Sequence, residues 1–371
     1  IFGGKEYTPA DFIIEGAGMV RAWFNVLHRV STLVFDSQAF NNVICGGTFA
    51  GNDGRKMSKT YGNFSDPKDV LEKLGGETLR LYLAGSAVMG GGETDWSDEV
   101  LSEQQKNVLI PIWNTYKYLG IYAELHDWTP EHANWTSNNV LDKWLESYMN
   151  KTTLEYSKHR EADDISGAVK LIQPAIDNIS GWFIRRSRDR FADGDTDALQ
   201  TLYTALVQFI KTFAPQMPFL TEEIYQNLVV GILPDAKESV HLELYPNVVE
   251  SEVDDKLLRE MEIVREICNL GQAIRVKNAL KVRQPLSKVF VFATDVNYEV
   301  KAIPRKSMNG GVAYKTEAST YSAIRNDLIE LLQDELNVKE VELVGKKPEV
   351  SETLKVEENN NIVVAMETTL T

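Results

Sequence analysis

Two lysines stand three positions apart in a glycine-flanked loop, where residues 53–60 read DGRKMSKT. Ammonium groups on such a loop can close over a polyphosphate and offset the negative charge that develops when a phosphorus–oxygen bond breaks. Asp66 and Pro67 then start a helix as N-cap and first residue, and a helix N-terminus offers amide donors to an anion. Lys56 and Lys59 are therefore candidate catalytic residues, although a solvated basic turn would have the same composition.

A cluster of arginines follows Trp182. The arginines are Arg185, Arg186, Arg188 and Arg190. A helical wheel drawn on the apolar stripe of residues 165–183 places Arg185 and Arg188 on the opposite, solvent-facing side. Outward arginines beside Trp182 suit phosphate contact and base stacking. The other two arginines flank the stripe, and we expect them to pair with carboxylates of neighbouring helices.

A second basic stretch lies between residues 256 and 288, with eight lysines and arginines against three glutamates. The whole chain has a net charge of −15, which opposes nucleic-acid binding because phosphate contacts depend on lysine and arginine. Acidic charge elsewhere can keep a protein in solution while a local patch binds an anion. The alternative is a solvated helix face. The candidate RNA-contacting residues of this stretch are Arg275, Lys277, Lys281 and Arg283.

The composition is that of a globular protein with two or three domains. Of the 371 residues, 43% are hydrophobic and 25% are charged. Cys45 and Cys268 are too far apart for a CxxC zinc or redox site, and unpaired thiols indicate a reducing, cytosolic compartment. No apolar run approaches the roughly 18 residues of a membrane span. Because the sequence starts at Ile1 rather than at a methionine, we expect it to be a piece of a longer protein.

We call the loop that carries Lys56 and Lys59 the lysine loop. The elements that must position it are predicted within residues 1–97. Apolar residues recur at helical spacing over 17–35, and 42–49 reads as a short buried strand. Helices are predicted over 66–75 and 77–84, on the C-terminal side of the loop. This part resembles the end of an α/β domain.

Residues 98–247 are predicted to be a helical bundle. Pro174 should kink its third helix, because proline lacks the amide that would bond to the Lys170 carbonyl. A strand-like segment at 240–246 follows the bundle. The helices are predicted at 98–124, 138–160, 162–191, 196–213 and 219–230.

Residues 248–371 are predicted to contain a long helix and a small α/β module. The long helix covers 251–278 and a second helix 323–336, and the strands cover 288–294, 338–344 and 361–370. The fold class is therefore multidomain and mainly α, with α/β parts at both ends.

The K-M-S-K string resembles the KMSKS loop of class I aminoacyl-tRNA synthetases, with Thr60 in the place of the last serine. Residues 180–191 (SGWFIRRSRDRF) are similar to the NWYIRRSRxRF segment of isoleucyl-tRNA synthetases, and residues 281–286 (KVRQPL) and 336–339 (LNVK) are similar to further segments of that family. On these motifs the chain is identified as a member of the isoleucyl-tRNA synthetase family, covering its C-terminal part.

The resemblance implies three domains and one activity. Residues 1–97 would be the end of a Rossmann-type catalytic domain, residues 98–247 the anticodon-binding domain, and residues 248–371 a junction helix with a small tRNA-contacting module. The family activates isoleucine with ATP, accompanied by Mg²⁺, and transfers it to tRNA(Ile). The residues implied to bind ATP are Lys56, Met57, Ser58 and Lys59.

An amino-acid site is implied at residues 15–24. This stretch, EGAGMVRAWF, aligns with the family pattern E-G-x-D-Q-x-R-G-W-F. There the glutamate meets the amino-acid ammonium and the tryptophan walls the aliphatic pocket, which gives those roles to Glu15 and Trp23. The family's aspartate and glutamine are replaced here by Gly18 and Met19. Core packing is the alternative role for Trp23.

The resemblance further implies a cytoplasmic, monomeric protein that partners tRNA(Ile) and no membrane, with no metal or zinc site in this stretch. The chain contains no H-I-G-H motif, so it is expected to be inactive alone. A valyl-type synthetase fragment is one alternative, disfavoured by the sequence at 180–191. A non-catalytic tRNA-binding protein derived from a synthetase is the other, and the substitutions at Gly18 and Met19 are its main support.

Overall fold

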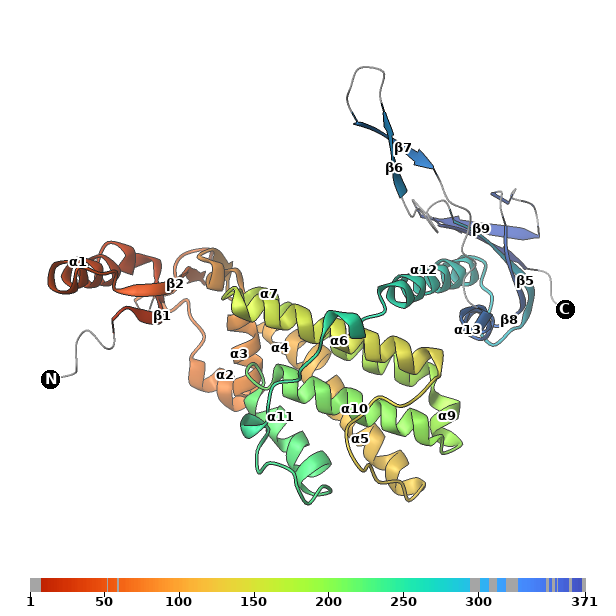
Figure 1. The fold of residues 1–371 in the computed structure, drawn as a ribbon, viewed down its shortest axis with the longest axis horizontal. Coiled ribbons are helices and arrows are strands. Elements are labelled where there is room, and N and C mark those ends of the chain that lie inside the picture. The colour runs from red at the N-terminus through yellow and green to blue at the C-terminus, as the bar shows by residue number, and fades with distance from the viewer. Residues whose placement is uncertain are drawn as a thin grey trace. The chain divides into compact units, whose positions relative to one another are not determined.

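The computed structural model of the chain describes residues 8–51, 53–58, 60–293, 301–306, 312–317, 326–344, 347–348, 351, 353–359 and 362–368. The chain divides into two compact units, Ile1–Val253 and Asp254–Thr371, and each is described by itself. Helices make up most of the first unit, whereas the second packs two helices against a sheet (Figure 1). The architecture is helix-rich, as the sequence predicted.

The first unit opens with two small parallel sheets. β1 (Ala10–Gly16) pairs with β2 (Phe40–Gly46) across the crossover helix α1 (Trp23–Phe35). β3 (Thr48–Ala50) pairs with β4 (Glu93–Asp95). The sequence predicted neither β1 nor β4, because both are short and lack a clear alternation of apolar and polar residues.

Gly47 splits the strand predicted at 42–49. Its N–H donates a 2.8 Å hydrogen bond to the Val88 carbonyl, and a Cβ on it would lie 1.6 Å from the Gly92 carbonyl oxygen. The chain can pass this close only without a side chain. Strand pairing therefore stops here and restarts with a new partner strand.

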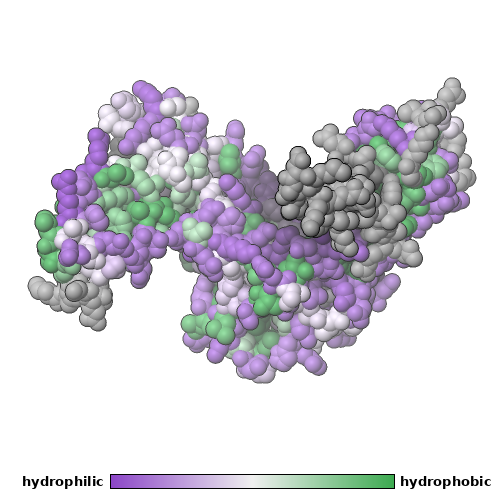
Figure 2. Space-filling model, turned by 45° about the horizontal axis from the view of Figure 1, so that its top comes forward, coloured by the Kyte–Doolittle hydropathy of each residue, from purple (hydrophilic) through white to green (hydrophobic). Residues whose placement is uncertain are grey.

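The apolar stripe predicted over 17–35 is largely exposed. A 3₁₀ turn (Ala17–Val20) precedes α1, and Phe24 is the buried apolar side chain of that helix. Hydrophobic residues also gather on this part of the molecule, at the left of the space-filling view (Figure 2). The apolar periodicity therefore predicted the helix α1, but the apolar face that it predicted to be buried is largely exposed to solvent. The exposed apolar side chains of α1 are Trp23, Val26, Val30, Leu33 and Val34.

The helices of the first unit follow the sequence prediction closely. α10 is the central helix of the bundle, with buried side chains on all of its faces, as expected for a helix surrounded by others. π-helical segments at Gln105–Leu109, Asp177–Ile184 and Gln226–Val230 continue α4, α8 and α11. The helices are α2 (Pro67–Leu74), α3 (Gly76–Gly85), α4 (Asp98–Gln104), α5 (Ile110–Leu125), α6 (Val140–Glu161), α7 (Ile165–Lys170), α8 (Ile172–Ile176), α9 (Arg188–Ala192), α10 (Thr196–Phe213) and α11 (Pro218–Tyr225).

The long helix predicted at 162–191 is interrupted, which confirms the expected effect of Pro174. The break falls at Leu171, three residues before the proline, because the Lys170 carbonyl has no amide partner at position 174. A second interruption at Ser187 precedes α9. The prediction treated the stretch as one kinked helix, and the structure divides it into separate segments.

The prediction of a strand at residues 240–246 is wrong. Val240–Leu242 is a 3₁₀ turn, and the residues after it pair with no described strand. The Val240 amide donates to the Glu222 carboxylate of α11 at 2.9 Å, and the Ser239 hydroxyl accepts from the His241 amide at 3.1 Å. Side chains therefore satisfy the backbone donors that a strand would offer to a neighbour.

The second unit packs α12 (Asp255–Lys277) and α13 (Asn326–Leu336) on a four-stranded sheet with the order β8-β5-β10-β9. β10 is antiparallel to both neighbours, and β5 and β8 are parallel. The sequence predicted all of these elements except β9, and it did not predict the separate β6–β7 hairpin. The strands are β5 (Leu286–Ala293), β6 (Lys301–Lys306), β7 (Val312–Glu317), β8 (Val338–Leu343), β9 (Leu354–Glu358) and β10 (Ile362–Glu367).

Candidate functional site

The lysine loop, residues 51–63, folds back on β3. The Gly51 amide donates to the Arg55 carbonyl at 2.8 Å, and the Met57 amide donates to the Phe49 carbonyl at 3.2 Å. Lys56 forms an isolated antiparallel bridge with Ala50. The strand therefore holds the first half of the loop through backbone hydrogen bonds.

Met57 anchors the loop to the apolar interior. Its side chain packs against a buried cluster formed by Val70, Tyr82, Trp96 and Leu101. Lys56, the residue before it, is exposed. The K-M-S-K string therefore alternates an outward ammonium group with an inward methionine, which places Lys56 where an anion in solution can reach it.

Of the other two residues of the K-M-S-K string, the structure describes Ser58 but not Lys59. The Ser58 hydroxyl is half-buried and accepts a 3.2 Å hydrogen bond from the Thr60 amide. Lys59 lies outside the described residues, so its role stays a prediction from the sequence.

An ion pair occupies the tip of the loop. The Arg55 guanidinium donates to Asp53 Oδ2 from Nη2 at 2.6 Å and from Nε at 2.8 Å, and it lies 4.6 Å from the centre of the Tyr61 ring. Hydrogen bonds from Asn63, then from Arg55, lower the pKa of Asp53 to about 2. Asp53 is therefore ionised at neutral pH and offsets the charge of Arg55.

The predicted amino-acid site lies at the end of β1 and the start of α1. Glu15 is exposed, and its carboxylate accepts a 3.0 Å hydrogen bond from the Gly16 amide. Trp23 is 43% exposed and contacts the Phe24 ring at 5.5 Å between centroids. The indole is therefore partly exposed in this chain, and its role in the amino-acid site stays a prediction, with packing as the alternative.

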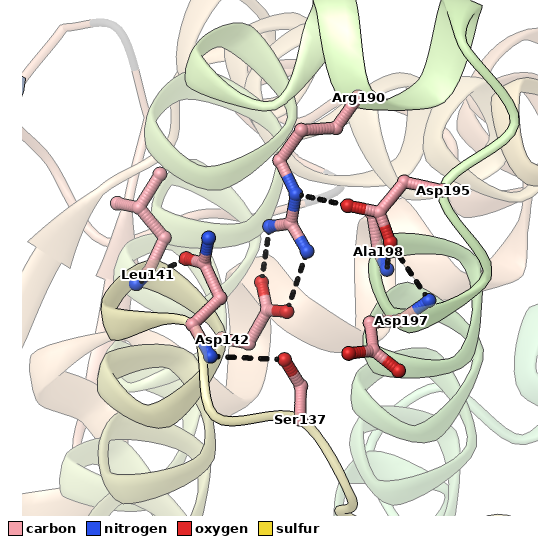
Figure 3. Close-up of polar contacts among 8 residues, drawn as sticks. Ser137, Leu141, Asp142, Arg190, Asp195, Asp197 and Ala198 are labelled. Carbon is pink, nitrogen blue, oxygen red and sulfur yellow. Dashed lines mark hydrogen bonds and ion pairs between the residues drawn. The ribbon is translucent and has the colours of Figure 1, made fainter.

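Arg190 joins three segments of the bundle through carboxylates (Figure 3). Its Nη1 and Nη2 atoms donate to Asp142 at 2.6 and 2.8 Å, and its Nε donates to Asp195 at 2.6 Å. Burial alone would lower the pKa of Arg190, but the two carboxylates raise it above its usual value. The predicted pairing of this arginine with bundle carboxylates is confirmed, so Arg190 is a structural residue.

The remaining arginines of the cluster separate into exposed and packed side chains. Arg185 and Arg188 are exposed, as the helical wheel predicted. The Arg186 guanidinium lies 3.3 Å from the centre of the Trp182 ring, and that tryptophan is buried, with 7% exposure. The expectation that Trp182 stacks on a base is therefore corrected, because neighbouring side chains already cover its ring.

The basic stretch of the second unit also contains one buried member. Arg275 is fully buried and donates from Nη1 to the carbonyls of Lys281 and Gln284, both at 2.9 Å. Its Nη2 donates to the carbonyls of Leu336 and Asn337 at 2.6 and 3.1 Å. The expectation that Arg275 contacts RNA is therefore corrected, since it fastens the end of α12 to the segments around it.

The other basic residues of this stretch reach solvent. Lys277 is exposed and donates to both carboxylate oxygens of Glu357 at 2.6 Å. Lys281 and Arg283 lie in the turn between α12 and β5 and are exposed. These three residues remain available to a phosphate, with Lys277 already paired to a carboxylate.

Glu77 connects the part that contains the lysine loop to the bundle. Its Oε1 atom accepts hydrogen bonds from the amides of Phe219 and Leu220 at 2.6 and 2.9 Å, at the N-terminus of α11. Met217, the N-cap residue, offers no side-chain cap. Burial raises the pKa of Glu77, and the two amide hydrogen bonds oppose that shift. A carboxylate from α3 therefore replaces the missing cap.

The described residues contain neither a candidate metal cluster nor a candidate membrane-spanning helix. No group of three or more histidine, cysteine, aspartate or glutamate side chains there is placed to hold a metal ion. None of the helices in the described part of the chain is long and apolar enough to span a membrane.

Family models match two stretches of the chain, and the second stretch extends from the first unit into α12 and β5 of the second. Residues 4–97 match the model for class I tRNA synthetases (I, L, M and V). Residues 142–290 match the model for the anticodon-binding domain of tRNA ligase. The chain belongs to the class I aminoacyl-tRNA synthetases. The match at 4–97 includes the lysine loop of this synthetase chain.

Curated relatives of this synthetase chain are isoleucine–tRNA ligases. The relative from Streptomyces coelicolor is 36% identical over 290 residues, which are 76% of this chain and 27% of the relative. The relative from Chlamydia trachomatis serovar L2 is 35% identical over 355 residues, which are 93% of this chain and 31% of the relative. The chain therefore spans less than a third of the length of these relatives.

A solved structure shares the fold of this synthetase chain. It is the ternary complex of the agnB2 LeuRS of Agrobacterium radiobacter K84 with tRNA and LeuAMS. The TM-score is 0.50 at 15% sequence identity, over 92% of this chain and 38% of that chain. At this identity the likeness concerns the fold alone.

Proposed function

We propose that this chain forms the lysine-loop and tRNA-binding part of an isoleucine–tRNA ligase. The observation that supports the proposal is the placement of Lys56, exposed on a loop that Met57 anchors to the core, in a chain whose curated relatives are isoleucine–tRNA ligases. Within the proposal, residues 1–97 end the catalytic domain, residues 98–247 bind the anticodon, and residues 248–371 contact tRNA elsewhere.

The reaction needs no nucleophile from the protein. The carboxylate of isoleucine attacks the α-phosphorus of ATP, the bond to the pyrophosphate oxygen breaks, and isoleucyl-adenylate forms. A hydroxyl group at the 3′ end of tRNA(Ile) then attacks the carbonyl carbon of the adenylate, the isoleucyl ester of the tRNA forms, and AMP leaves. In this scheme Lys56 and Lys59 stabilise the negative charge on the departing pyrophosphate, together with the Mg²⁺ that accompanies ATP as substrate.

Glu15 and Trp23 are the proposed isoleucine-binding residues. Glu15 is an exposed carboxylate, which can bind an ammonium group, and Trp23 is an exposed indole, which can line an apolar pocket. The 371 residues contain no H-I-G-H motif. We therefore expect that the 371-residue chain alone does not activate isoleucine, and the activity tests use the full-length gene product.

Replacing Trp23 by alanine in the full-length gene product should weaken isoleucine activation and reduce discrimination against valine. A single methylene is worth only about 1–3 kcal/mol to an apolar pocket, so a missing wall can remove most of that preference. The measurement is kcat/KM for ATP–pyrophosphate exchange with each amino acid. Trp113→Ala, a half-buried tryptophan of α5, is the control. Unchanged selectivity with a lowered Tm would assign Trp23 to packing alone.

The 371-residue chain should bind tRNA, and the affinity should fall steeply with salt. Arg185 and Arg188 of the first unit are the main candidates for phosphate contact, with Lys281 and Arg283 of the second. Each phosphate contact that is lost should lower the slope of log K against log salt by about one. The measurement is a series of filter-binding titrations, starting at low salt and repeated at higher salt, with tRNA(Ile) and an unrelated tRNA.

The variant for this test reverses the charges of Arg185 and Arg188 to glutamate. Its control reverses Lys68 and Lys73, two exposed lysines of α2, and so changes the net charge by the same amount. We expect weaker binding and a smaller salt slope for the arginine variant only. Equal binding of both tRNAs, or no binding at roughly tens of micromolar chain, would contradict the proposed anticodon recognition.

The two alternatives give different results in the same measurements. A valyl-type enzyme would activate valine in preference to isoleucine. A non-catalytic tRNA-binding protein, which the replacement of the family's aspartate and glutamine by Gly18 and Met19 favours, would bind tRNA but show no exchange with any amino acid.

A further inference from the structure

Asn63 lies at the far end of the lysine loop, and its side-chain amide contacts the loop at four points. Its Oδ1 accepts from the Ser58 amide at 2.9 Å. Its Nδ2 donates to Asp53 Oδ1 at 2.8 Å and to the carbonyls of Arg55 and Lys56 at 3.2 and 3.4 Å. The amide therefore contacts the backbone on both sides of Lys56 and Met57: it contacts Arg55 before this pair and Ser58 after it.

The contacts use both ends of the amide. The oxygen accepts from the backbone on the C-terminal side of Met57, and the nitrogen donates to the backbone on its N-terminal side. An aspartate would lack the donor and would place a second carboxylate beside Asp53. Only asparagine among side chains of this length supplies an acceptor and two donors on one planar group.

Gly51 lets Asn63 approach the loop. A Cβ at Gly51 would lie 2.3 Å from the Asn63 carbonyl oxygen and 2.9 Å from its Nδ2 atom. Because real Cβ atoms do not come this close to backbone atoms, any side chain at Gly51 would move Asn63 away. The glycine at the start of the loop and the asparagine at its end are therefore one packing unit.

We infer that Asn63 is a positioning residue, whose side chain holds the backbone of residues 55–58, from which Lys56 extends, in the conformation that stabilises the departing pyrophosphate. The inference rests on the proposed function and assigns a residue that the K-M-S-K string does not include. A lysine side chain is long and flexible, so the place of its ammonium group depends on the backbone from which it starts. A misplacement of about 1 Å at a reacting centre can cost a factor on the order of 10² in rate.

The kinetic test replaces Asn63 by alanine in the full-length gene product. We expect kcat for isoleucine-dependent ATP–pyrophosphate exchange to fall by about tenfold to a hundredfold, with KM for isoleucine unchanged, because Asn63 acts on the lysine loop and not on the amino-acid site. Gly51→Ala should lower kcat in the same way by displacing Asn63. Asn227→Ala is the matched control, since that asparagine contacts only Glu223 on its own helix among the contacts described.

The structural test uses the 371-residue chain and trypsin, which cleaves after the lysines and arginine of the loop. Asn63→Ala should speed cleavage at residues 55–59 while the Tm of the chain stays close to the parent value. A parent protein without exchange activity would overturn the proposed function. An active parent with Asn63→Ala at full kcat, or with kcat lowered only in proportion to a loss of folded protein, would overturn the positioning role alone.

Discussion

Replacing Lys59 by alanine in the full-length gene product should lower isoleucine-dependent ATP–pyrophosphate exchange by a factor of about 10²–10³. An ammonium group that acts on the departing pyrophosphate stabilises the transition state more than the bound substrates, so kcat should carry the loss. Lys56→Ala should have a similar effect, because Lys56 is exposed on the same loop. Equilibrium binding of isoleucine should hardly change.

The control for both lysine variants is Lys68→Ala, an exposed lysine on α2, directly after the loop. It removes the same charge from the same region, so it separates a general electrostatic effect from a specific contact. Near-parental exchange in both Lys56→Ala and Lys59→Ala would show that the loop is only a basic turn.

Replacing Arg190 by alanine should lower the free energy of unfolding of the bundle by about 3 kcal/mol. The substitution leaves the Asp142 side chain, which is 2% exposed, as a buried carboxylate without its cation. Arg190→Lys should restore little, because an ammonium group cannot make the two parallel hydrogen bonds. The measurement is a urea titration followed by circular dichroism. Arg188→Ala, an exposed neighbour, should stay within about 0.5 kcal/mol of the parent, and equal effects of the two variants would contradict the structural role of Arg190.

The contribution of Arg190 should also depend on pH. Burial alone would raise the pKa of Asp195, but hydrogen bonds from Arg190 and from the Ala198 amide hold it below its usual value. A carboxyl with a depressed pKa in the folded state stabilises the protein above its unfolded pKa of about 3.9 and loses that effect as the pH falls through the folded value. The difference in unfolding free energy between the parent and Arg190→Ala should therefore shrink below about pH 4. A difference that is constant from pH 7 to pH 3 would contradict the assignment.

Local patterns in the sequence predicted the elements of the bundle and the exposure of single arginines. The stripe from residue 165 to 183 was sufficient to place Arg185 and Arg188 in solvent and Arg190 beside carboxylates, because a helix fixes the direction of each side chain relative to its neighbours. The break near Pro174 was predictable because proline lacks the amide that would bond to the Lys170 carbonyl. These conclusions need only the geometry of one helix.

The burial of Arg275 and Trp182 could not be predicted in this way. Arg275 donates to carbonyls about sixty residues further along the chain as well as to two nearby ones, and Trp182 is 7% exposed, with the Arg186 guanidinium over its ring. The sequence gives no sign of the distant carbonyls, and it does not show whether a neighbouring arginine turns toward the ring or toward solvent. A basic or aromatic residue in a charged stretch is therefore a weak indicator of a binding surface.

In the lysine loop, too, one part could be predicted from the local sequence and another part could not. The string of residues 56–59 identified it without any structure, because that order of residue types is specific. The contacts of Asn63 depend on how the loop turns back on β3, and no local pattern connects an asparagine to backbone atoms five to eight residues before it. The sequence therefore predicted candidate reactive groups, but it did not predict the residue that we propose supports them.

The place of β10 in its sheet has a consequence for the order in which a ribosome completes the two units. β10 lies between β5 and β9, and its residue Ile362 pairs with Ala293. Every partner within the first unit has been synthesised once residue 253 is made, so the bundle can fold while the rest of the chain is still being translated. The second unit must wait for residues 362–367, and until then β5 has an unpaired edge that a neighbouring nascent chain can meet. Slow translation between residues 254 and 367 should therefore favour aggregation of the second unit while sparing the first.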